Sequence, residues 1–177
     1  YLKQLGFNVD YAPVADVLTN PGNTAIGTRS FGSDASMVAD MVIKELEGLS
    51  SQGVFGAVKH FPGQGGVSGD SHDGAVTLDK SLEELMQTEL VPFQKALENG
   101  VSFVMVGHIS VPQVVGDNTP ASLSQMMVSN VLREQLGYQG IVITDAMNMG
   151  AITGTYTADQ AAVMAVNAGV DMILMPD

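Results

Sequence analysis

The sequence predicts an α/β fold, an incomplete (β/α)8 TIM barrel that comprises about the last five strands and their intervening helices. Apolar, strand-like runs alternate with helical patterns along the whole chain. The runs are almost continuously apolar, which is typical of parallel strands buried on both faces. Polar residues recur where successive runs end, and the carboxyl ends of barrel strands form one rim where active sites lie.

An open, doubly wound sheet is the alternative arrangement. No Gly-x-Gly-x-x-Gly follows the first run, which disfavours a dinucleotide-binding fold of that kind. The start at residues 1–6 resembles the end of a helix with its glycine stop. We therefore expect residues 1–177 to be the C-terminal portion of one catalytic barrel domain, cut from a longer sequence that supplies about three upstream units.

The strands are identified by runs rich in β-branched and aromatic residues. They are expected over residues 7–14, 53–61, 101–109, 141–144 and 171–175.

Four helical patterns separate these strands, and each begins at a residue that can cap it. The expected starts are Ser33 or Asp34, Ser81, Ser124 and Thr157. Glu84 lies three residues after Ser81, and Gln160 lies three after Thr157, so both of these starts carry a capping box. Pro92 should kink or restart the second helix. Gly137 and Gly169 are expected to end the last two helices.

Composition excludes several classes of function. With 7 basic and 19 acidic residues the formal net charge is −12, which disfavours nucleic-acid partners and anionic membrane surfaces. No apolar run reaches the ~20 residues that span a bilayer, so no membrane segment is expected. The absence of cysteine excludes a disulfide framework, a thiol nucleophile and thiolate zinc sites.

Asp145 directly follows the apolar run 141–144, which places a carboxylate at the expected rim. A carboxylate there can act as the nucleophile of a retaining glycosidase. It can equally be a helix N-cap in a βα loop, and the residue pattern alone leaves both interpretations open.

The segment Asp70-Ser71-His72 lies in a glycine-rich loop. A carboxylate can orient an imidazole and make it a proton donor and acceptor near neutral pH. The alternative is a solvated turn with an incidental histidine. The neighbouring glycines favour a mobile loop that can bring the pair over a substrate.

Lys59 and His60 are adjacent at the end of an expected strand, where neighbouring side chains point to opposite faces. Both reach one pocket only if the backbone departs from strand geometry. We therefore predict a distorted or cis peptide at Lys59–His60 or at Phe61–Pro62, cis being far less costly before proline. The alternative is one pocket residue and one core histidine.

Other candidates are weaker. Arg29 can hold a substrate hydroxyl or carboxylate, or form a rim salt bridge of little energetic value. His108 can line the pocket or bond to a backbone carbonyl. Met147 can pack beneath a sugar ring, although methionine more often fills a core. Asp16 is expected to be structural.

Lys59-His60-Phe61-Pro62-Gly63-x-Gly65 followed by Asp70-Ser71-His72 resembles the signature of glycoside hydrolase family 3, in its β-N-acetylglucosaminidase branch. Weaker matches follow in the same order as in that family, and the resemblance extends from about residue 5 to the C-terminus. They are Ala12-Pro13-Val14-x-Asp16-Val17, Arg29-Ser30-Phe31 and Thr144-Asp145-Ala146-Met147-x-Met149.

The resemblance implies that Asp145 is the nucleophile and that His72 is the general acid/base with Asp70 as its partner. Arg29, Lys59 and His60 would bind sugar hydroxyls. The implied partner is a carbohydrate, an N-acetylglucosamine-containing glycoside or muropeptide, and neither a cofactor nor a metal is implied.

Two departures from the family pattern stand out. Gln64 occupies a position where many members have a second histidine, and we expect altered loop contacts rather than lost chemistry. An aspartate that grips the sugar in the family lies on an earlier strand, upstream of this sequence.

Four alternatives remain open at this point: a family 3 β-glucosidase, a glycoside phosphorylase, a metal-dependent barrel hydrolase, and a non-catalytic sugar-binding relative. The metal-dependent reading would use His60, His72, His108 and Asp145, but no His-x-His follows any strand.

Overall fold

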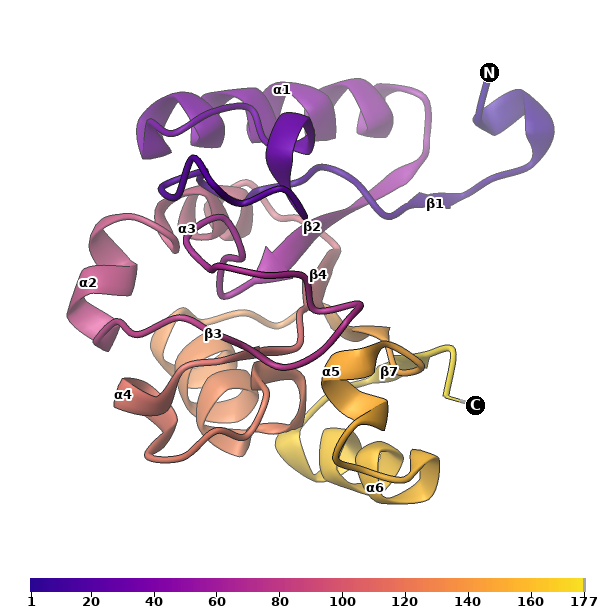
Figure 1. The fold of residues 1–177 in the computed structure, drawn as a ribbon. Helices are drawn as coiled ribbons and strands as arrows, with labels where there is room; N and C mark the ends of the chain where they lie inside the picture. The colour runs from indigo at the N-terminus through magenta and orange to yellow at the C-terminus, as the bar shows by residue number, and fades with distance from the viewer. Residues whose placement is uncertain (177) are drawn as a thin grey trace.

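The computed structural model describes residues 1–176, and its centre is a curled sheet of five parallel strands, which forms half of a barrel (Figure 1). The strands follow the order β1-β2-β4-β6-β7, so each strand pairs with the next main strand along the chain. This arrangement confirms the predicted α/β class and partial barrel. The strands are β1 (Val9–Asp10), β2 (Phe55–Phe61), β4 (Phe103–Val106), β6 (Ile141–Ala146) and β7 (Met172–Leu174).

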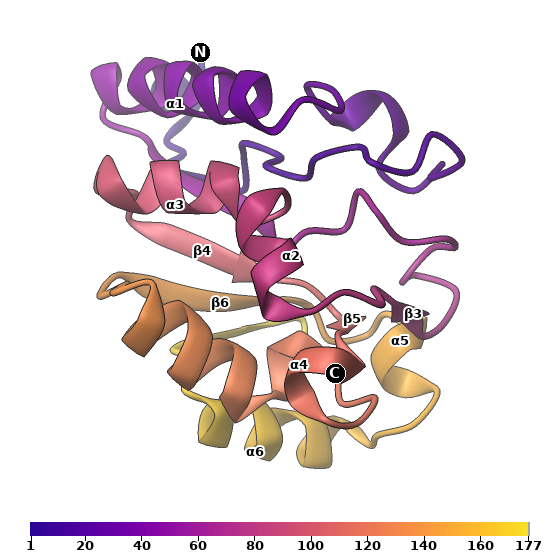
Figure 2. The ribbon, with the colours of Figure 1, turned by 90° about the vertical axis from the view of Figure 1, so that its left-hand side faces the viewer.

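Helices connect the strands and lie along the outside of the curled sheet (Figure 2). The longer ones are α1 (Ala35–Ser51), α3 (Val91–Glu98), η4 (Met126–Gln135) and α6 (Ala158–Ala168). Short helical turns complete the connections: η1 (Lys3–Leu5), η2 (Gly27–Arg29), α2 (Leu82–Gln87), α4 (Pro112–Val115), η3 (Ala121–Leu123) and α5 (Gly150–Thr153).

The helix starts follow local sequence rules. The Asp34 side chain accepts a hydrogen bond from the Met37 amide at the start of α1. Capping boxes are present at Ser81 with Glu84 and at Thr157 with Gln160. Pro92 falls in the first turn of α3, so the helix predicted from Ser81 is restarted there as α2 and α3. These predictions are confirmed because each depends on residues within one or two turns.

Three elements differ from their predictions. The strand predicted over residues 7–14 narrows to Val9–Asp10, because Pro13 has no N–H to donate to the ladder. The strand predicted over residues 101–109 divides into β4 and β5 (Ile109–Ser110). At the break, a Cβ on Gly107 would lie 2.5 Å from Ile109 Cδ1 and 3.0 Å from the Cβ of His60. The helix predicted from Ser124 begins at Met126 and is π-helical.

The division after β4 creates a second, smaller sheet. Strand β5 pairs in parallel with β3 (Val76–Thr77), which begins four residues after His72. That pairing brings the chain after the loop to the carboxyl end of β4 (Figure 2).

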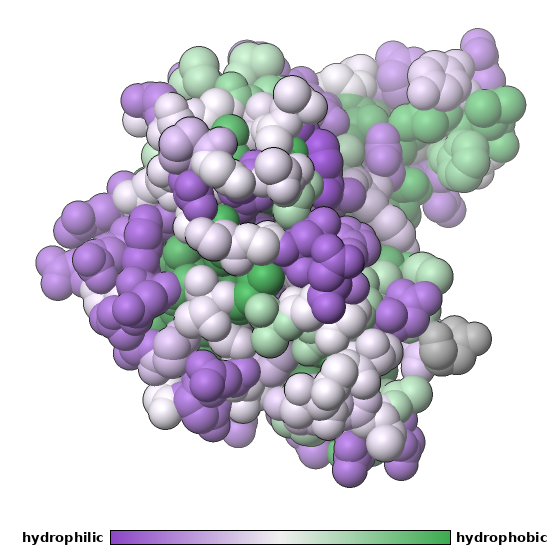
Figure 3. Space-filling model, in the orientation of Figure 1, coloured by the Kyte–Doolittle hydropathy of each residue, from purple (hydrophilic) through white to green (hydrophobic). Residues whose placement is uncertain are grey.

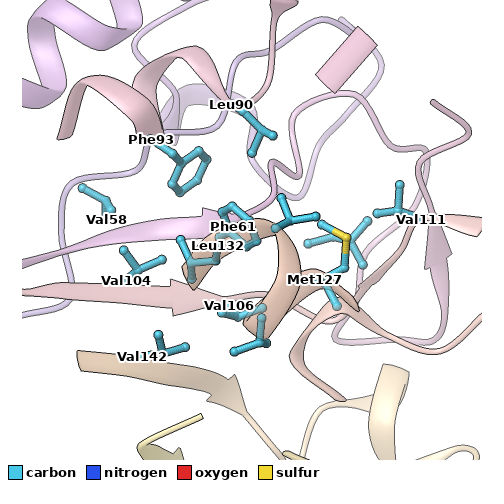
Figure 4. Packing of buried hydrophobic residues seen from close by; sticks show 14 of the residues in the cluster. Val58, Phe61, Leu90, Phe93, Val104, Val106, Val111, Met127, Leu132 and Val142 are labelled. Carbon is cyan, nitrogen blue, oxygen red and sulfur yellow. The ribbon is translucent and has the colours of Figure 1, made fainter. Parts of the chain in front are cut away.

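The core lies between the sheet and its helices (Figure 4). The rings of Phe61 and Phe93 meet edge to face, with centroids 5.5 Å apart. Valines from three neighbouring strands pack around them, and full burial of such a side chain contributes ~1.5–3 kcal/mol. They are Val58, Val104, Val106 and Val142, all fully buried.

Several of the exposed apolar side chains lie near the two edge strands. Leu5 is 69% and Phe7 54% exposed in the N-terminal segment, which forms an apolar projection in Figure 3. Met172, in β7, is 44% exposed. Among the helices of residues 1–176, none combines the length and the apolar character needed to cross a membrane.

Candidate active site

Asp145 lies near the end of β6, at the carboxyl rim of the sheet. Its Oδ1 accepts a hydrogen bond from the Ala146 amide at 2.8 Å, and its Oδ2 lies 3.7 Å from His60 Nε2. It does not cap the following helix, because α5 begins after Met149 and has no side-chain cap. The Asp145 side chain is 16% exposed, so the carboxylate is accessible while its surroundings are mostly protein.

Asp16 binds the segment that carries His60. Its Oδ1 accepts hydrogen bonds from the His60 amide at 3.2 Å and the Gln64 amide at 2.6 Å. Its Oδ2 lies 2.8 Å from His60 Nδ1, and the Asp16 side chain is fully buried. Because an ionised carboxylate only accepts hydrogen bonds, the Nδ1 of His60 carries a hydrogen and its Nε2 faces the site.

The charges of Arg29 and Asp145, which lie beside His60, also act on Lys59, its neighbour in sequence. The peptide bonds Lys59–His60 and Phe61–Pro62 are both cis, as is Ala12–Pro13, which confirms the predicted departure from strand geometry. The pairing of β2 with β4 also shifts register between Val58 and Phe61. Burial lowers the pKa of Lys59, as does the nearby Arg29 guanidinium, whereas Asp145 acts to raise it.

Arg29 ends the helical turn η2 and reaches His60. Its Nη1 donates to the carbonyl of Ala25 at 3.1 Å, and its Nη2 lies 3.4 Å from His60 Nε2. Among residues 1–176, no carboxylate lies within ion-pairing distance of the guanidinium. The rim salt bridge considered from the sequence is therefore not formed within this part of the chain.

The Asp70-Ser71-His72 loop holds a histidine–aspartate pair. Asp70 Oδ1 lies 2.7 Å from His72 Nδ1 and accepts a hydrogen bond from the His72 amide at 2.9 Å. That backbone bond is the largest cause of a lowered pKa of Asp70. The His72 side chain is 64% exposed, and its Nδ1 is occupied by Asp70, so its Nε2 is the atom open to a substrate.

The loop and the strand end that carries Asp145 meet at Gly150. The Gly150 amide donates to the carbonyl of His72 at 3.0 Å, and the Ala151 amide donates to that of Ser71 at 3.0 Å. Gly150 is five residues beyond Asp145 in the chain. The predicted pair and the predicted nucleophile are thus brought to one end of the fold.

His108 and Met147 lie behind this surface. His108 is buried, with Nδ1 2.7 Å from Ser122 Oγ and Nε2 3.0 Å from the carbonyl of Ala146. Burial lowers its pKa. Of the two roles considered for His108, the bond to a backbone carbonyl is formed, and a place in the substrate pocket stays a prediction. Met147 is only 3% exposed and belongs to the hydrophobic core, which matches the core-filling alternative considered for it.

The residues considered for a metal site do not form one. His60 and Asp145 approach each other, whereas both ring nitrogens of His108 bond to protein atoms and His72 pairs with Asp70. Within residues 1–176, no three histidine, aspartate or glutamate side chains are arranged to hold a metal ion.

Comparison with known proteins assigns this arrangement to a family. Residues 2–177 match the glycosyl hydrolase family 3 N terminal domain. The chain belongs to glycosyl hydrolase family 3.

Relatives of this family 3 domain align with nearly all of its length. It is 35% identical to Beta-hexosaminidase A of Pseudoalteromonas piscicida, a match that covers 99% of this chain and 31% of that protein. It is 40% identical to Beta-hexosaminidase LpqI of Mycobacterium tuberculosis, covering 98% and 45%. The family 3 β-N-acetylglucosaminidase structure from Paenibacillus sp. str. FPU-7 superposes with a TM-score of 0.96 at 42% identity, covering 98% and 33%. The family 3 domain therefore spans from about a third to about half of these relatives.

The hydrogen bonds of Asp16 confirm its expected structural role, but the sequence did not predict which residues of the family 3 site it would hold. The available signal was its position in the loop after the first strand, alongside other polar strand ends. A lone aspartate is not diagnostic, and its partners His60 and Gln64 lie 44 and 48 residues away.

Proposed function

We propose that the full-length protein is a retaining exo-glycosidase that releases terminal β-linked N-acetylglucosamine. Family membership indicates a glycoside hydrolase, and the relatives named above are β-hexosaminidases and a β-N-acetylglucosaminidase. The observation that carries the proposal is the meeting of the Asp70/His72 loop with the segment after Asp145, at the bond between the Gly150 amide and the His72 carbonyl.

In the proposed first step, a carboxylate oxygen of Asp145 attacks the anomeric carbon and forms a covalent ester with the sugar. His72 Nε2–H gives its proton to the glycosidic oxygen as the bond to the aglycone breaks. In the second step, His72 takes a proton from water, whose oxygen replaces Asp145 at the anomeric carbon. Most retaining glycosidases use two carboxylates for this chemistry, so here the histidine–aspartate pair takes the place of one.

Arg29, Lys59 and His60 are assigned to the sugar hydroxyls. Their proximity to Asp145 supports this role, because the same donors would hold the sugar ring against the nucleophile. His108 is assigned to positioning, since its Nε2 holds the carbonyl of Ala146, the residue after Asp145.

We also propose that residues 1–177 form the C-terminal portion of a single barrel in the full-length protein. Support comes from the five parallel strands, compared with the eight of a closed barrel, and from the exposed apolar residues near β1 and β7. Closing the barrel would cover both edges.

The test is an assay of the full-length protein on 4-nitrophenyl N-acetyl-β-glucosaminide beside the matching β-glucoside. We expect preferential turnover of the N-acetylglucosaminide, a first-formed product with retained β configuration by proton NMR, and loss of activity in Asp145→Asn. Equal or better turnover of the glucoside would overturn the substrate assignment. Inverted product would overturn the covalent step, and loss of turnover with a chelator would favour the metal-dependent alternative.

The acceptor is tested in the same assay by adding inorganic phosphate. We expect N-acetylglucosamine as the product with and without phosphate. Formation of the sugar phosphate as the main product would identify a phosphorylase instead of a hydrolase.

A further inference from the structure

We propose that Gln64 is a positioning residue that fixes the general-acid loop, residues 70–73, relative to the nucleophile. The inference rests on the proposed function, because it assigns Gln64 a role in delivering the proton from His72. It concerns a buried side-chain amide that the catalytic steps above do not use.

The backbone of Gln64 is fixed by two hydrogen bonds to neighbouring side chains. Its amide donates to Asp16 Oδ1 at 2.6 Å, and its carbonyl accepts from Asn23 Nδ2 at 2.6 Å. The other oxygen of Asp16 holds His60 Nδ1 at 2.8 Å. The position of Gln64 is therefore tied to the His60 ring, which in turn lies 3.7 Å from Asp145.

The Gln64 side chain links this fixed backbone to the general-acid loop. Its Nε2 donates to Ser71 Oγ at 3.0 Å, and Gln64 and Ser71 are only 4% and 1% exposed. Within residues 1–176, this is the one side-chain hydrogen bond between residues 59–65 and residues 70–73. The residue it holds, Ser71, directly precedes His72.

Ser71 is fixed from the opposite side by the segment after β6. Its carbonyl accepts a hydrogen bond from the Ala151 amide, and the next carbonyl, that of His72, accepts one from Gly150. The backbone bonds hold the loop to α5, which follows the strand that carries Asp145, and the Gln64 bond holds it to the segment just after the strand that carries His60. Together they set where the His72 ring stands.

Loss of the Gln64 amide would leave the Ser71 hydroxyl buried without its partner, so the loop would shift to find one. A small shift is enough to impair proton delivery, because catalysis is sensitive to displacements of about 1 Å. Attack by Asp145 would be affected far less, since Asp145 is held on its own strand. The expected defect is therefore specific to leaving groups that need a proton.

The experiment compares Gln64→Ala with wild type in the full-length protein on two N-acetyl-β-glucosaminides. The 2,4-dinitrophenyl substrate leaves without protonation, whereas the methyl glycoside requires it. We expect kcat/KM on the methyl glycoside to fall about tenfold more than on the dinitrophenyl glycoside, a fraction of the ~10²–10⁴ that a general acid supplies. Gln113→Ala, which removes an exposed glutamine bonded to Asp79, is the matched control and should leave both rates unchanged.

Two further variants separate positioning from general damage to the fold. Ser71→Ala removes the same bond from its other end, so the Gln64→Ala/Ser71→Ala double variant should be no worse than the worse single variant. Gln64→His keeps an N–H donor at this position and should restore turnover of the methyl glycoside to within about threefold of wild type. If Gln64→Ala fails to fold, the single variants Ser71→Ala and Gln64→His still test the role.

Equal losses on the two substrates, or fully additive losses in the double variant, would overturn the positioning role and leave Gln64 a structural residue. An unchanged Gln64→Ala would overturn it as well. A wild-type protein that hydrolyses neither substrate would instead contradict the proposed function.

Discussion

The Nδ1 of His60 lies 2.8 Å from the Oδ2 of Asp16, a carboxylate with no exposed surface. The other oxygen of this carboxylate accepts hydrogen bonds from the amides of His60 and Gln64. One buried side chain thus organises the segment that supplies His60, the histidine proposed to bind sugar, and Gln64, the residue proposed to anchor the general-acid loop.

Asp16→Ala should therefore strongly destabilise the protein. The change leaves two amides and one ring nitrogen buried without their acceptor, and each such group costs ~1–3 kcal/mol. We expect the free energy of unfolding, measured by urea titration, to fall by about 3 kcal/mol or more. Asp40→Ala, on the exposed side of α1, is the matched control and should stay within ~0.5 kcal/mol of wild type. Equal effects of the two substitutions would contradict the role of Asp16.

Gly150→Ala should displace the acid loop. A Cβ at this position would lie 2.6 Å from the His72 carbonyl oxygen and 2.8 Å from the Asp73 carbonyl carbon, both of them backbone atoms that cannot move independently of the loop. We expect faster proteolytic cleavage within residues 70–73 and lower turnover of the methyl glycoside. Gly48→Ala, in the exposed interior of α1 with no atom within 4 Å of the added Cβ, should instead stabilise by ~0.5–1 kcal/mol. Unchanged cleavage in Gly150→Ala would show that the loop is not held there.

On the 2,4-dinitrophenyl glycoside, which leaves without a proton from His72, the alkaline limb of the kcat/KM profile should depend on Lys59. Because burial lowers its pKa below the ordinary value of 10.5, the ammonium is lost earlier as pH rises, and with it a charged donor to the sugar. We expect kcat/KM to fall with a midpoint below 10.5. Lys59→Arg, which stays charged, should move this midpoint to higher pH. Lys44→Arg, on the surface of α1, is the control and should leave the midpoint unchanged. If Lys59→Arg also leaves the midpoint unchanged, the titration belongs to another group.

Asp70 should remain ionised when the pH drops below the ordinary carboxyl value of 3.8, because the His72 amide lowers its pKa. For a carboxyl whose native pKa is lowered, the stabilising contribution is present above the unfolded pKa. It is lost as the pH falls through the native pKa. The carboxyl ¹³C shift of Asp70 should therefore titrate below 3.8.

A substitution can separate the effect of the His72 amide on the pKa of Asp70 from the effect of the His72 imidazole. His72→Ala removes the imidazole but keeps the backbone amide, so most of the lowered pKa of Asp70 should survive the substitution. Asp117, whose pKa is lowered by the amide of Thr119 in the same way, is an internal reference. A return of Asp70 to its ordinary value in His72→Ala would assign the shift to the imidazole.

The amino-acid sequence by itself determined the alternation of buried parallel strands and helices, the capped helix starts and the strand ends where the polar residues gather. It also predicted the departure from strand geometry beside His60, which the cis bonds confirm. These features depend on residues a few positions apart, so their physical causes can be identified in one stretch of chain. The family motif added the assignment of Asp145, Asp70 and His72, whose chemical roles stay proposals.

The tertiary structure alone decided which of these residues meet. Asp16 reaches His60 across 44 positions, His108 holds Ala146 across 38, and Gly150 makes room for the backbone of the acid loop. It also buried Met147 in the core and divided the strand after Val106. Contacts of this kind arise when separate strands are aligned by packing, and neither local propensity nor residue spacing encodes that alignment.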